Sequence, residues 1–120
     1  MIEFVKSEIH RLKMTVVWSW QGWWAAWRTE KTLRQWTLAN ALSVLLAMTL
    51  DLTSTERALI IGFGLLILVA ELLNTSIEET VNRISYVDHH LSKKAKDIGS
   101  AAVAVTAITA GLVWLIILIG

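Results

Sequence analysis

The chain has 120 residues, of which 55% are hydrophobic and 18% charged, and its formal net charge is +1 at pH 7. This composition favours a single membrane-associated domain and excludes the basic surface that general nucleic-acid binding requires. The sequence has no cysteine and no proline. Disulfides and cysteine-ligated metals are therefore excluded, and long unbroken helices are favoured.

Residues 1–30 predict one amphipathic helix that lies in the membrane surface. Its apolar residues recur at steps of three and four, which places them on one helical stripe; they are Val5, Ile9, Leu12, Val16, Trp20, Trp23 and Trp27. Such a stripe can face lipid, or it can pack on other helices of the same chain. Five of the seven tryptophans lie between Trp18 and Trp27, which is typical of a membrane–water interface.

Three further helices, 33–50, 56–80 and 96–119, are expected to contain membrane spans. The last includes 23 uncharged residues from Ile98 to Gly120, enough to cross a hydrocarbon core of about 30 Å. The first two reach that length if Arg34 and Glu71 lie at the interface. A soluble helical bundle is the alternative, but a chain of this size could not cover all three apolar runs. The predicted fold is therefore an all-α membrane protein with a surface helix and three spans, forming one domain, 1–120.

The connecting segments predict the orientation. Lysines and arginines cluster in residues 1–34 and 83–96, with Arg57 as the exception. The positive-inside rule places the N-terminus and the 82–97 loop in the cytoplasm. The turn at 51–57 would lie outside, with Ser54 or Thr55 capping the helix that follows. Small residues on the last span, at Ser100, Ala104, Ala107 and Gly111, predict its helix-packing face.

The most informative polar residues lie at the end of the second span. Glu71, Asn74 and Glu78 stand at i, i+3 and i+7, so they share one helical face. A carboxylate at membrane depth is costly and is a functional candidate by default. A reaction centre serving a lipid is one interpretation of this pattern. A small proton-coupled transporter with Glu71 as proton carrier and a non-catalytic membrane subunit are two others.

Nucleotide-binding loops of the known glycine-rich types are missing, so any ATP would be held by side chains on helices. Phosphoryl transfer needs a metal, positive groups and a residue that deprotonates the nucleophile. The candidate Mg²⁺ ligands are Glu30, Glu71, Glu78, Glu79 and Asp97, and the candidate phosphate partners are Arg11, Lys13, Lys94 and Lys96. A transition-metal pair at His89 and His90 is not expected, because adjacent histidines on a helix point apart.

Three motifs resemble one known family. They are Trp20-x-Gly22-x-x-Ala25-Ala26-Trp27-x-x-Glu30, Glu71-x-x-Asn74-x-x-x-Glu78 and Lys96-Asp97-x-Gly99-Ser100-Ala101-Ala102. In this order and spacing the chain, from about Arg11 to its C-terminus, is similar to the bacterial integral-membrane diacylglycerol kinases, a family that includes undecaprenol kinases. The resemblance implies a homotrimeric kinase of the inner membrane. It would transfer the γ-phosphoryl group of MgATP to diacylglycerol, giving phosphatidic acid, at active sites shared between subunits.

The resemblance also implies roles for individual residues. Glu71 would be the catalytic base, and Glu30 and Glu78 would hold Mg²⁺. The nucleotide site would comprise Arg11, Trp18, Glu30, Asn74, Glu78, His89, Lys96 and Asp97, and the lipid site Ser19, Trp27, Glu71 and Ser100.

The chain departs from the family pattern at four places. Trp18 replaces a usual tyrosine, Trp36 a frequent glutamate and Asn82 a frequent aspartate, and Val87-Asp88 is atypical. These departures leave the three glutamates untouched but affect the expected adenine contacts. Undecaprenol remains the alternative acceptor, because the glutamates serve either alcohol. The lysine motif and the tryptophan-rich first helix favour diacylglycerol.

Overall fold

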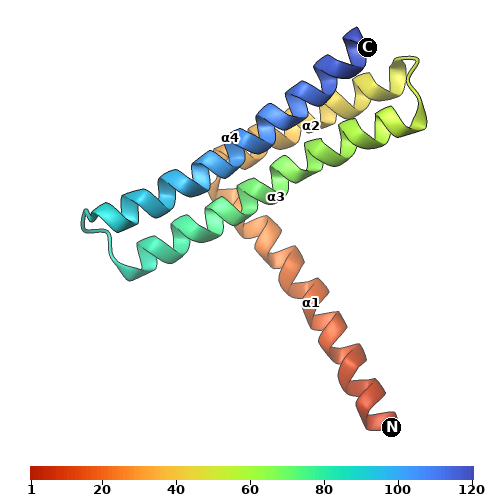
Figure 1. Ribbon diagram of the computed structural model, residues 1–120. Helices are drawn as coiled ribbons and strands as arrows, with labels where there is room; N and C mark the ends of the chain where they lie inside the picture. Colours follow the sequence, from red (N-terminus) through yellow and green to blue (C-terminus); the bar gives the residue numbers. More distant parts are fainter.

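The computed structural model covers residues 1–120 and consists of four helices and no strands. Helices α2 (Lys31–Thr49), α3 (Ser54–Ile84) and α4 (His90–Ile119) form an elongated bundle with α3 packed against both of the others. Helix α1 (Ile2–Thr29) leaves this bundle at a steep angle, and its N-terminal part projects freely (Figure 1). The predicted all-α membrane architecture is confirmed by this arrangement together with the apolar surface described below.

The predicted helix bounds were too short for α3 and α4. The structure continues α3 from residue 80 to Ile84 and starts α4 at His90 rather than 96. Polar residues in this region do not break a helix, since exposed Glu, Asn, Arg and Lys are tolerated in helical turns. The connection is therefore only the short segment 85–89, and both helices extend the bundle beyond the base of α1 (Figure 1).

A single residue makes the corner between α1 and α2. Glu30 adopts an extended conformation (φ −111°, ψ 100°) while its backbone amide still donates to the Ala26 carbonyl at 2.8 Å. The Arg34 guanidinium reaches back to donate to the carbonyl of Trp27, and Leu33 is fully buried at the same corner. These contacts fix the direction in which α1 leaves the bundle, and they hold the Glu30 side chain beside α3.

The turn between α2 and α3 is closed by a capping box. Thr53 Oγ1 accepts from the Glu56 amide at 3.1 Å, and Glu56 Oε1 accepts from the Thr53 amide at 2.8 Å. The cap is thus one residue earlier than the predicted Ser54 or Thr55. The Arg57 guanidinium donates to the carbonyls of Ala47 and Leu50 at 2.9 and 2.8 Å, which satisfies the end of α2.

Two glycines allow α3 to approach its neighbours closely. A Cβ on Gly64 would stand 2.3 Å from Asn40 Oδ1, and a Cβ on Gly99 would stand 2.3 Å from Asn74 Oδ1. The first contact joins α2 to α3 and the second joins α3 to α4. On α4 the buried positions are Gly99 and Val103. Ser100 and Ala104, the first two residues of the predicted small-residue face, are exposed, so within one chain α4 packs on α3 through the neighbouring positions Gly99 and Val103.

Most of the bundle surface is apolar. Only 12 of 120 residues are buried, while many leucines, isoleucines and valines of α2, α3 and α4 are exposed. Helices α3 and α4 are each long and apolar enough to cross a membrane. An exposed apolar surface of this extent is that of a membrane protein.

Helix α1 behaves differently along its length. Its N-terminal apolar side chains are exposed, among them Ile9, Leu12, Val16 and Trp20. Near its C-terminus it packs on α2 and α3, where Ala26 is buried. The C-terminal part of α1 therefore packs on other helices of the same chain, and its N-terminal part keeps an apolar stripe free that can face lipid. The helix runs unbroken through Gly22.

Candidate functional site

A cluster of carboxylates forms where the corner at Glu30 meets the middle of α3. Glu71 is only 4% exposed, and the charges of both Glu30 and Glu78 act on it. The side chain of Glu78 also accepts from Asn74 Nδ2 at 3.4 Å. The structure thus brings together in one chain the three glutamates that the sequence singled out.

Electrostatic repulsion at this cluster is only partly compensated. Partial burial and the nearby charges of Glu78 and Glu79 raise the pKa of Glu30 above its ordinary value, with Arg34 opposing the shift only in part. The carboxylates therefore form a site of excess negative charge, which is the environment that a hard cation neutralises.

The donors at the cluster fit Mg²⁺ in type and in number. Carboxylate oxygens are the ligands this ion prefers, and one or two of them suffice when phosphates and waters complete the coordination. No group of three or more His, Asp or Glu side chains could enclose an ion within one chain. The side-chain oxygen of Asn74 is a buried acceptor without a hydrogen-bond partner, and it packs against Gly99 of α4.

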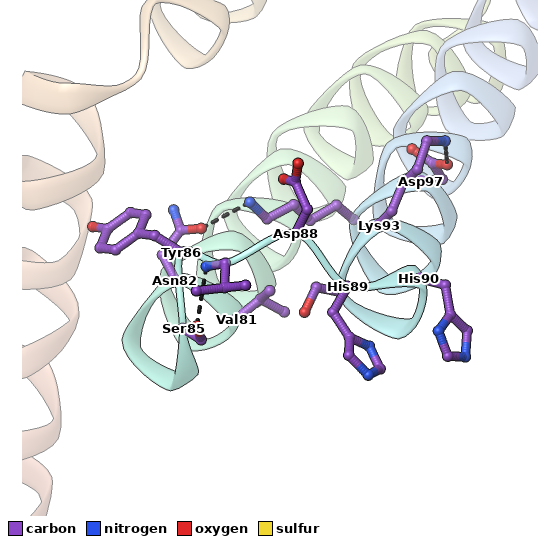
Figure 2. A pocket seen from close by; sticks show the side chains of 12 residues that line it. Val81, Asn82, Ser85, Tyr86, Asp88, His89, His90, Lys93 and Asp97 are labelled. Carbon is purple, nitrogen blue, oxygen red and sulfur yellow. Dashed lines mark hydrogen bonds and ion pairs between the residues drawn. The ribbon is translucent and has the colours of Figure 1, made fainter.

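A second feature lies one turn further along α3. A cavity of about 600 Å³ opens at the α3–α4 connection. It is lined by Val81, Asn82, Ser85, Tyr86, Val87, Asp88, His89, His90, Ser92, Lys93, Lys96 and Asp97 (Figure 2). Three of the expected nucleotide residues, His89, Lys96 and Asp97, therefore share one cavity. Its mixed polar and aromatic lining suits a hydrated, charged ligand with a flat ring.

Hydrogen bonds hold several of these side chains in place. Lys96 Nζ donates to Asn82 Oδ1 at 2.7 Å, which bridges α4 to α3. Asp97 pairs with Lys93 at 2.6 Å on the exposed side of α4, as Figure 2 shows. The Asn82–Lys96 bridge and the Asn74–Gly99 contact lie eight residues apart on α3, or about 12 Å along the helix. The carboxylate cluster and the cavity therefore follow one another along the same α3–α4 seam.

The histidine pair contradicts the expectation for adjacent residues on a helix. The rings of His89 and His90 stack, with centroids 4.6 Å apart, and Figure 2 shows them side by side. The reason is that His89 is the extended N-cap of α4 (φ −149°, ψ 137°) rather than a helical residue. Its Nδ1 accepts from the Leu91 amide at 3.1 Å, so this histidine also secures the helix start.

A third feature is a cavity of about 640 Å³ between α1 and α3. Its walls are Ser19, Gly22, Trp23, Ala25, Ala26 and Thr29 from α1 and Leu72, Thr75, Ser76 and Glu79 from α3. Among the expected lipid residues only Ser19 lines it. Small residues on the α1 side leave room for a ligand, and the α3 side continues the carboxylate cluster.

The remaining predicted residues lie apart from both cavities. Arg11 is exposed on α1 and pairs with Glu8, about 28 Å along the helix from Glu30. Trp18 is exposed on the same helix, and Ser100 is exposed on α4. Trp27 stacks on Trp23. Within one chain Arg11 and Trp18 are therefore not gathered with the carboxylates, whereas Trp27 stands one turn before Glu30.

The structure adds residues that the sequence reasoning did not assign. Tyr86 and Asn82 line the α3–α4 cavity, and Thr75 lies buried between Glu71 and Glu78 on α3. Tyr86 had a signal, since it is the only tyrosine of the chain and stands in a loop. The only signal in the sequence for Thr75 was its helical spacing from Glu71 and Glu78.

Comparison with known proteins gives a consistent result. The sequence model of the family described as prokaryotic diacylglycerol kinase matches residues 17–118. A diacylglycerol kinase of Pseudomonas aeruginosa is 46% identical over 117 residues, covering 96% of this chain and 94% of the relative. One of Escherichia coli is 43% identical over 100 residues, covering 83% and 82%. An undecaprenol kinase of Bacillus subtilis is 30% identical over 112 residues, covering 93% and 91%.

Proposed function

Because the chain belongs to the prokaryotic diacylglycerol kinase family and is a lipid kinase, we propose that it phosphorylates diacylglycerol with MgATP at the carboxylate cluster. The product is phosphatidic acid. The observation that carries this assignment is the near-complete burial of Glu71, at the end of the uncharged run 58–70 of α3, under the charges of Glu30 and Glu78. Because the chain belongs to a kinase family, the two alternative functions for these glutamates, in a proton-coupled transporter or in a non-catalytic membrane subunit, are not supported.

In this proposal Glu71 is the catalytic base. Glu71 accepts the proton of the acceptor hydroxyl as its oxygen attacks the γ-phosphorus. The new oxygen–phosphorus bond forms while the bond to the β-phosphate oxygen breaks, and ADP leaves. Alignment and charge neutralisation supply most of the rate gain in such a transfer.

Glu30 and Glu78 are the residues that would hold the metal. Their charges repel one another in the free protein, so binding a cation between them relieves a cost already present. When bound, Mg²⁺ neutralises negative charge on the phosphate oxygens and fixes their orientation. Asn74 and Glu78 remain joined by their hydrogen bond, which orients the Glu78 carboxylate.

The nucleotide occupies the α3–α4 cavity in this proposal. Lys96 supplies positive charge for the phosphates and is directed by its bond to Asn82. Tyr86 and the stacked histidines offer flat surfaces for a purine ring. Asp97 stands beside Lys96 in the same lining, and a carboxylate there can accept from a sugar hydroxyl or a base amino group.

We extend the proposal to a homotrimer with shared sites. Arg11 and Trp18 stand several turns before Glu30 on α1, and Arg11 in particular cannot reach the carboxylates of its own chain along a rigid helix. A neighbouring subunit's α1 can deliver Arg11 and Trp18 to the nucleotide, while Ser19, Trp27 and Ser100 remain candidates for the lipid. The exposed apolar faces of α2, α3 and α4 supply the contact area for such an assembly.

The proposed setting is the bacterial inner membrane. Helix α2 serves as the third span beside α3 and α4, while α1 lies along the cytoplasmic interface with its apolar stripe in lipid. Arg57 is the one basic residue near the α2–α3 turn, and the other basic residues lie at the opposite end. That distribution supports a cytoplasmic location for the N-terminus and the 82–97 region, on the side of the membrane where ATP is available.

The test is a direct assay of the purified protein in detergent micelles. Radiolabelled ATP with Mg²⁺ is offered with diacylglycerol and with undecaprenol in parallel, and label in the lipid fraction is counted. Transfer to diacylglycerol supports the proposal. Transfer to undecaprenol alone would assign the protein to the same chemistry on the acceptor named for the Bacillus relative. The absence of transfer to either alcohol contradicts the proposed function.

A further inference from the structure

Thr75 carries a buried hydroxyl with no hydrogen-bond partner. The residue is 7% exposed, and its Oγ1 contacts neither a side chain nor a backbone group suited to bond it. A hydroxyl buried without a partner costs free energy, so a native structure that retains one needs a reason for it.

Other threonines of the chain show what Thr75 lacks. Threonines within a helix usually donate to a backbone carbonyl about one turn earlier. The threonines that do so here are Thr15, Thr29, Thr37, Thr49, Thr80, Thr106 and Thr109. Thr75 lies well inside α3 and makes no such bond. Its hydrogen is therefore available, whereas theirs are committed to their own helices.

Thr75 is one of the residues that line the cavity between α1 and α3. Among the other hydroxyls of that lining, Ser19 donates to the Thr15 carbonyl at 2.8 Å and Thr29 donates to the Ala25 carbonyl at 3.1 Å, while Ser76 is exposed. Glu79, when ionised, can only accept. Thr75 therefore carries a buried hydroxyl donor in this lining that has no acceptor.

The register of α3 places this donor beside the proposed base. Thr75 follows Glu71 by four residues, so the two share a helical face and are offset by about 6 Å along the axis. The hydroxyl that Glu71 deprotonates must keep its oxygen free to attack, and a second donor on that oxygen would weaken it as a nucleophile. The natural partner of Thr75 is a different oxygen of the same lipid. In a 1,2-diacylglycerol the carbon next to the one that bears the hydroxyl carries an ester, whose carbonyl oxygen is a hydrogen-bond acceptor.

We propose that Thr75 donates its hydroxyl hydrogen to an ester carbonyl of the acceptor lipid and thereby selects glycerol diesters over alcohols without an ester. The inference rests on the proposed lipid kinase function and adds a specificity-determining residue to it. An acceptor without a carbonyl, such as a polyprenol or a glycerol diether, leaves this hydroxyl unpaired and gains nothing from it.

The experiment compares two acceptors that differ only at the ester. The purified kinase is assayed in mixed micelles with a 1,2-diacylglycerol and with the 1,2-dialkylglycerol of equal chain length. We expect the wild-type KM for the diester to be lower by about fivefold, the effect of one neutral hydrogen bond. Thr75→Val should raise the diester KM to the diether value and leave KM for ATP and for the diether unchanged. Thr75→Ser, which keeps the hydroxyl, should retain the preference.

Thr80→Val is the matched control. It removes a threonine hydroxyl from the same helix, but one that is exposed and bonded to the Ser76 carbonyl at 2.7 Å, so the diester preference should persist. Equal wild-type KM values for diester and diether overturn the proposal without any variant. An equal loss on both acceptors in Thr75→Val overturns it as well. Failure to phosphorylate either glycerolipid is a different result and counts against the kinase assignment itself.

Discussion

Two regions of α3, the turn that joins it to α2 and the stretch beside Glu30, differ in whether their polar side chains have partners. At the α2–α3 turn the polar groups are paired: Thr53 and Glu56 cap each other, and Arg57 satisfies two carbonyls of α2. Deeper on the same side, Trp114 donates to Ser43 Oγ at 2.8 Å across the bundle. In lipid no water is present to replace these bonds, so each stabilises the fold.

Near the Glu30 corner the polar groups are left unpaired or in mutual repulsion. Glu71 is buried among like charges, and Asn74 Oδ1 and Thr75 Oγ1 have no partners. Such costs are typical of functional sites, which agrees with the proposed active site in this region. We therefore expect variants at the α2–α3 turn to change stability and variants near the Glu30 corner to change activity.

The largest expected effect is the loss of activity in Glu71→Gln. The amide keeps the size of the side chain but cannot take the acceptor's proton, so kcat should fall by about 10²–10⁴-fold. Removing a buried charge from a repulsive cluster should leave thermal stability equal or higher. Initial rates with saturating diacylglycerol and ATP measure the first effect, and thermal unfolding in detergent the second. A variant with wild-type kcat would contradict the role of Glu71.

A smaller effect is expected from Glu78→Gln on the metal requirement. Loss of one charged ligand should raise the half-saturating Mg²⁺ concentration by about tenfold or more, since a bond to a charged group contributes about 1.5–3 kcal/mol. The titration is done at fixed ATP, with rates extrapolated to saturating metal. Glu56→Gln, at the α2–α3 turn, is the control whose Mg²⁺ requirement should stay unchanged. An unaltered requirement in Glu78→Gln would remove this residue from the metal site.

The two close-packed glycines allow the contrast between the two regions to be tested with one type of substitution. Gly64→Ala places a methyl group against Asn40, and Gly99→Ala places one against Asn74. We expect each to cost about 1–3 kcal/mol of stability through overpacking. Only Gly99→Ala should also raise KM for ATP, because it displaces Asn74 from the site. Unfolding and nucleotide titrations measure the pair.

Gly62→Ala is the control for both, since nothing lies within 4 Å of the added methyl group. It should be neutral or stabilising by about 0.4–1 kcal/mol. Equal effects of Gly64→Ala and Gly99→Ala on KM for ATP would argue against a nucleotide role for Asn74.

The smallest effect concerns the pH dependence of stability at Glu30. Its pKa is raised above the ordinary value of 4.5 by burial and by Glu78 and Glu79. The folded state therefore binds the proton more tightly than the unfolded state, and stability falls as pH rises from 4.5 through the raised pKa. Above that window the ionised group leaves the protein less stable, by under about 1 kcal/mol once solvent screening is included.

Glu30→Gln should remove this part of the slope. The measurement is the unfolding midpoint in metal-free detergent solution between pH 4 and pH 8. The variant should be the more stable protein at neutral pH and lose that advantage at the acid end. Parallel profiles of unfolding midpoint against pH for wild type and variant would show that the acidic neighbours do not raise the pKa of Glu30.

Much of the fold could be predicted from the sequence because the helices of a membrane protein produce local patterns of apolar residues. Apolar runs located the bundle helices, and the three-and-four spacing located α1. The cap at Thr53 could also have been predicted, since Thr53 and Glu56 have the spacing of a capping box, although the prediction made was Ser54 or Thr55. The end of α3 at Ile84 was not readable, because the polar residues before it are compatible with both helix and loop.

The chain alone determined which glutamates share a face, since Glu71 and Glu78 stand on one helix and their register is fixed by its periodicity. Only the tertiary structure decided that Glu30 joins them, because the angle of the α1–α2 corner sets where that side chain lies. It also decided that Gly99 rather than Ser100 faces α3, and that the Thr75 hydroxyl stays unpaired. Local sequence fixes the phase of a helix about its own axis, but the neighbours of a side chain depend on how separate helices are packed.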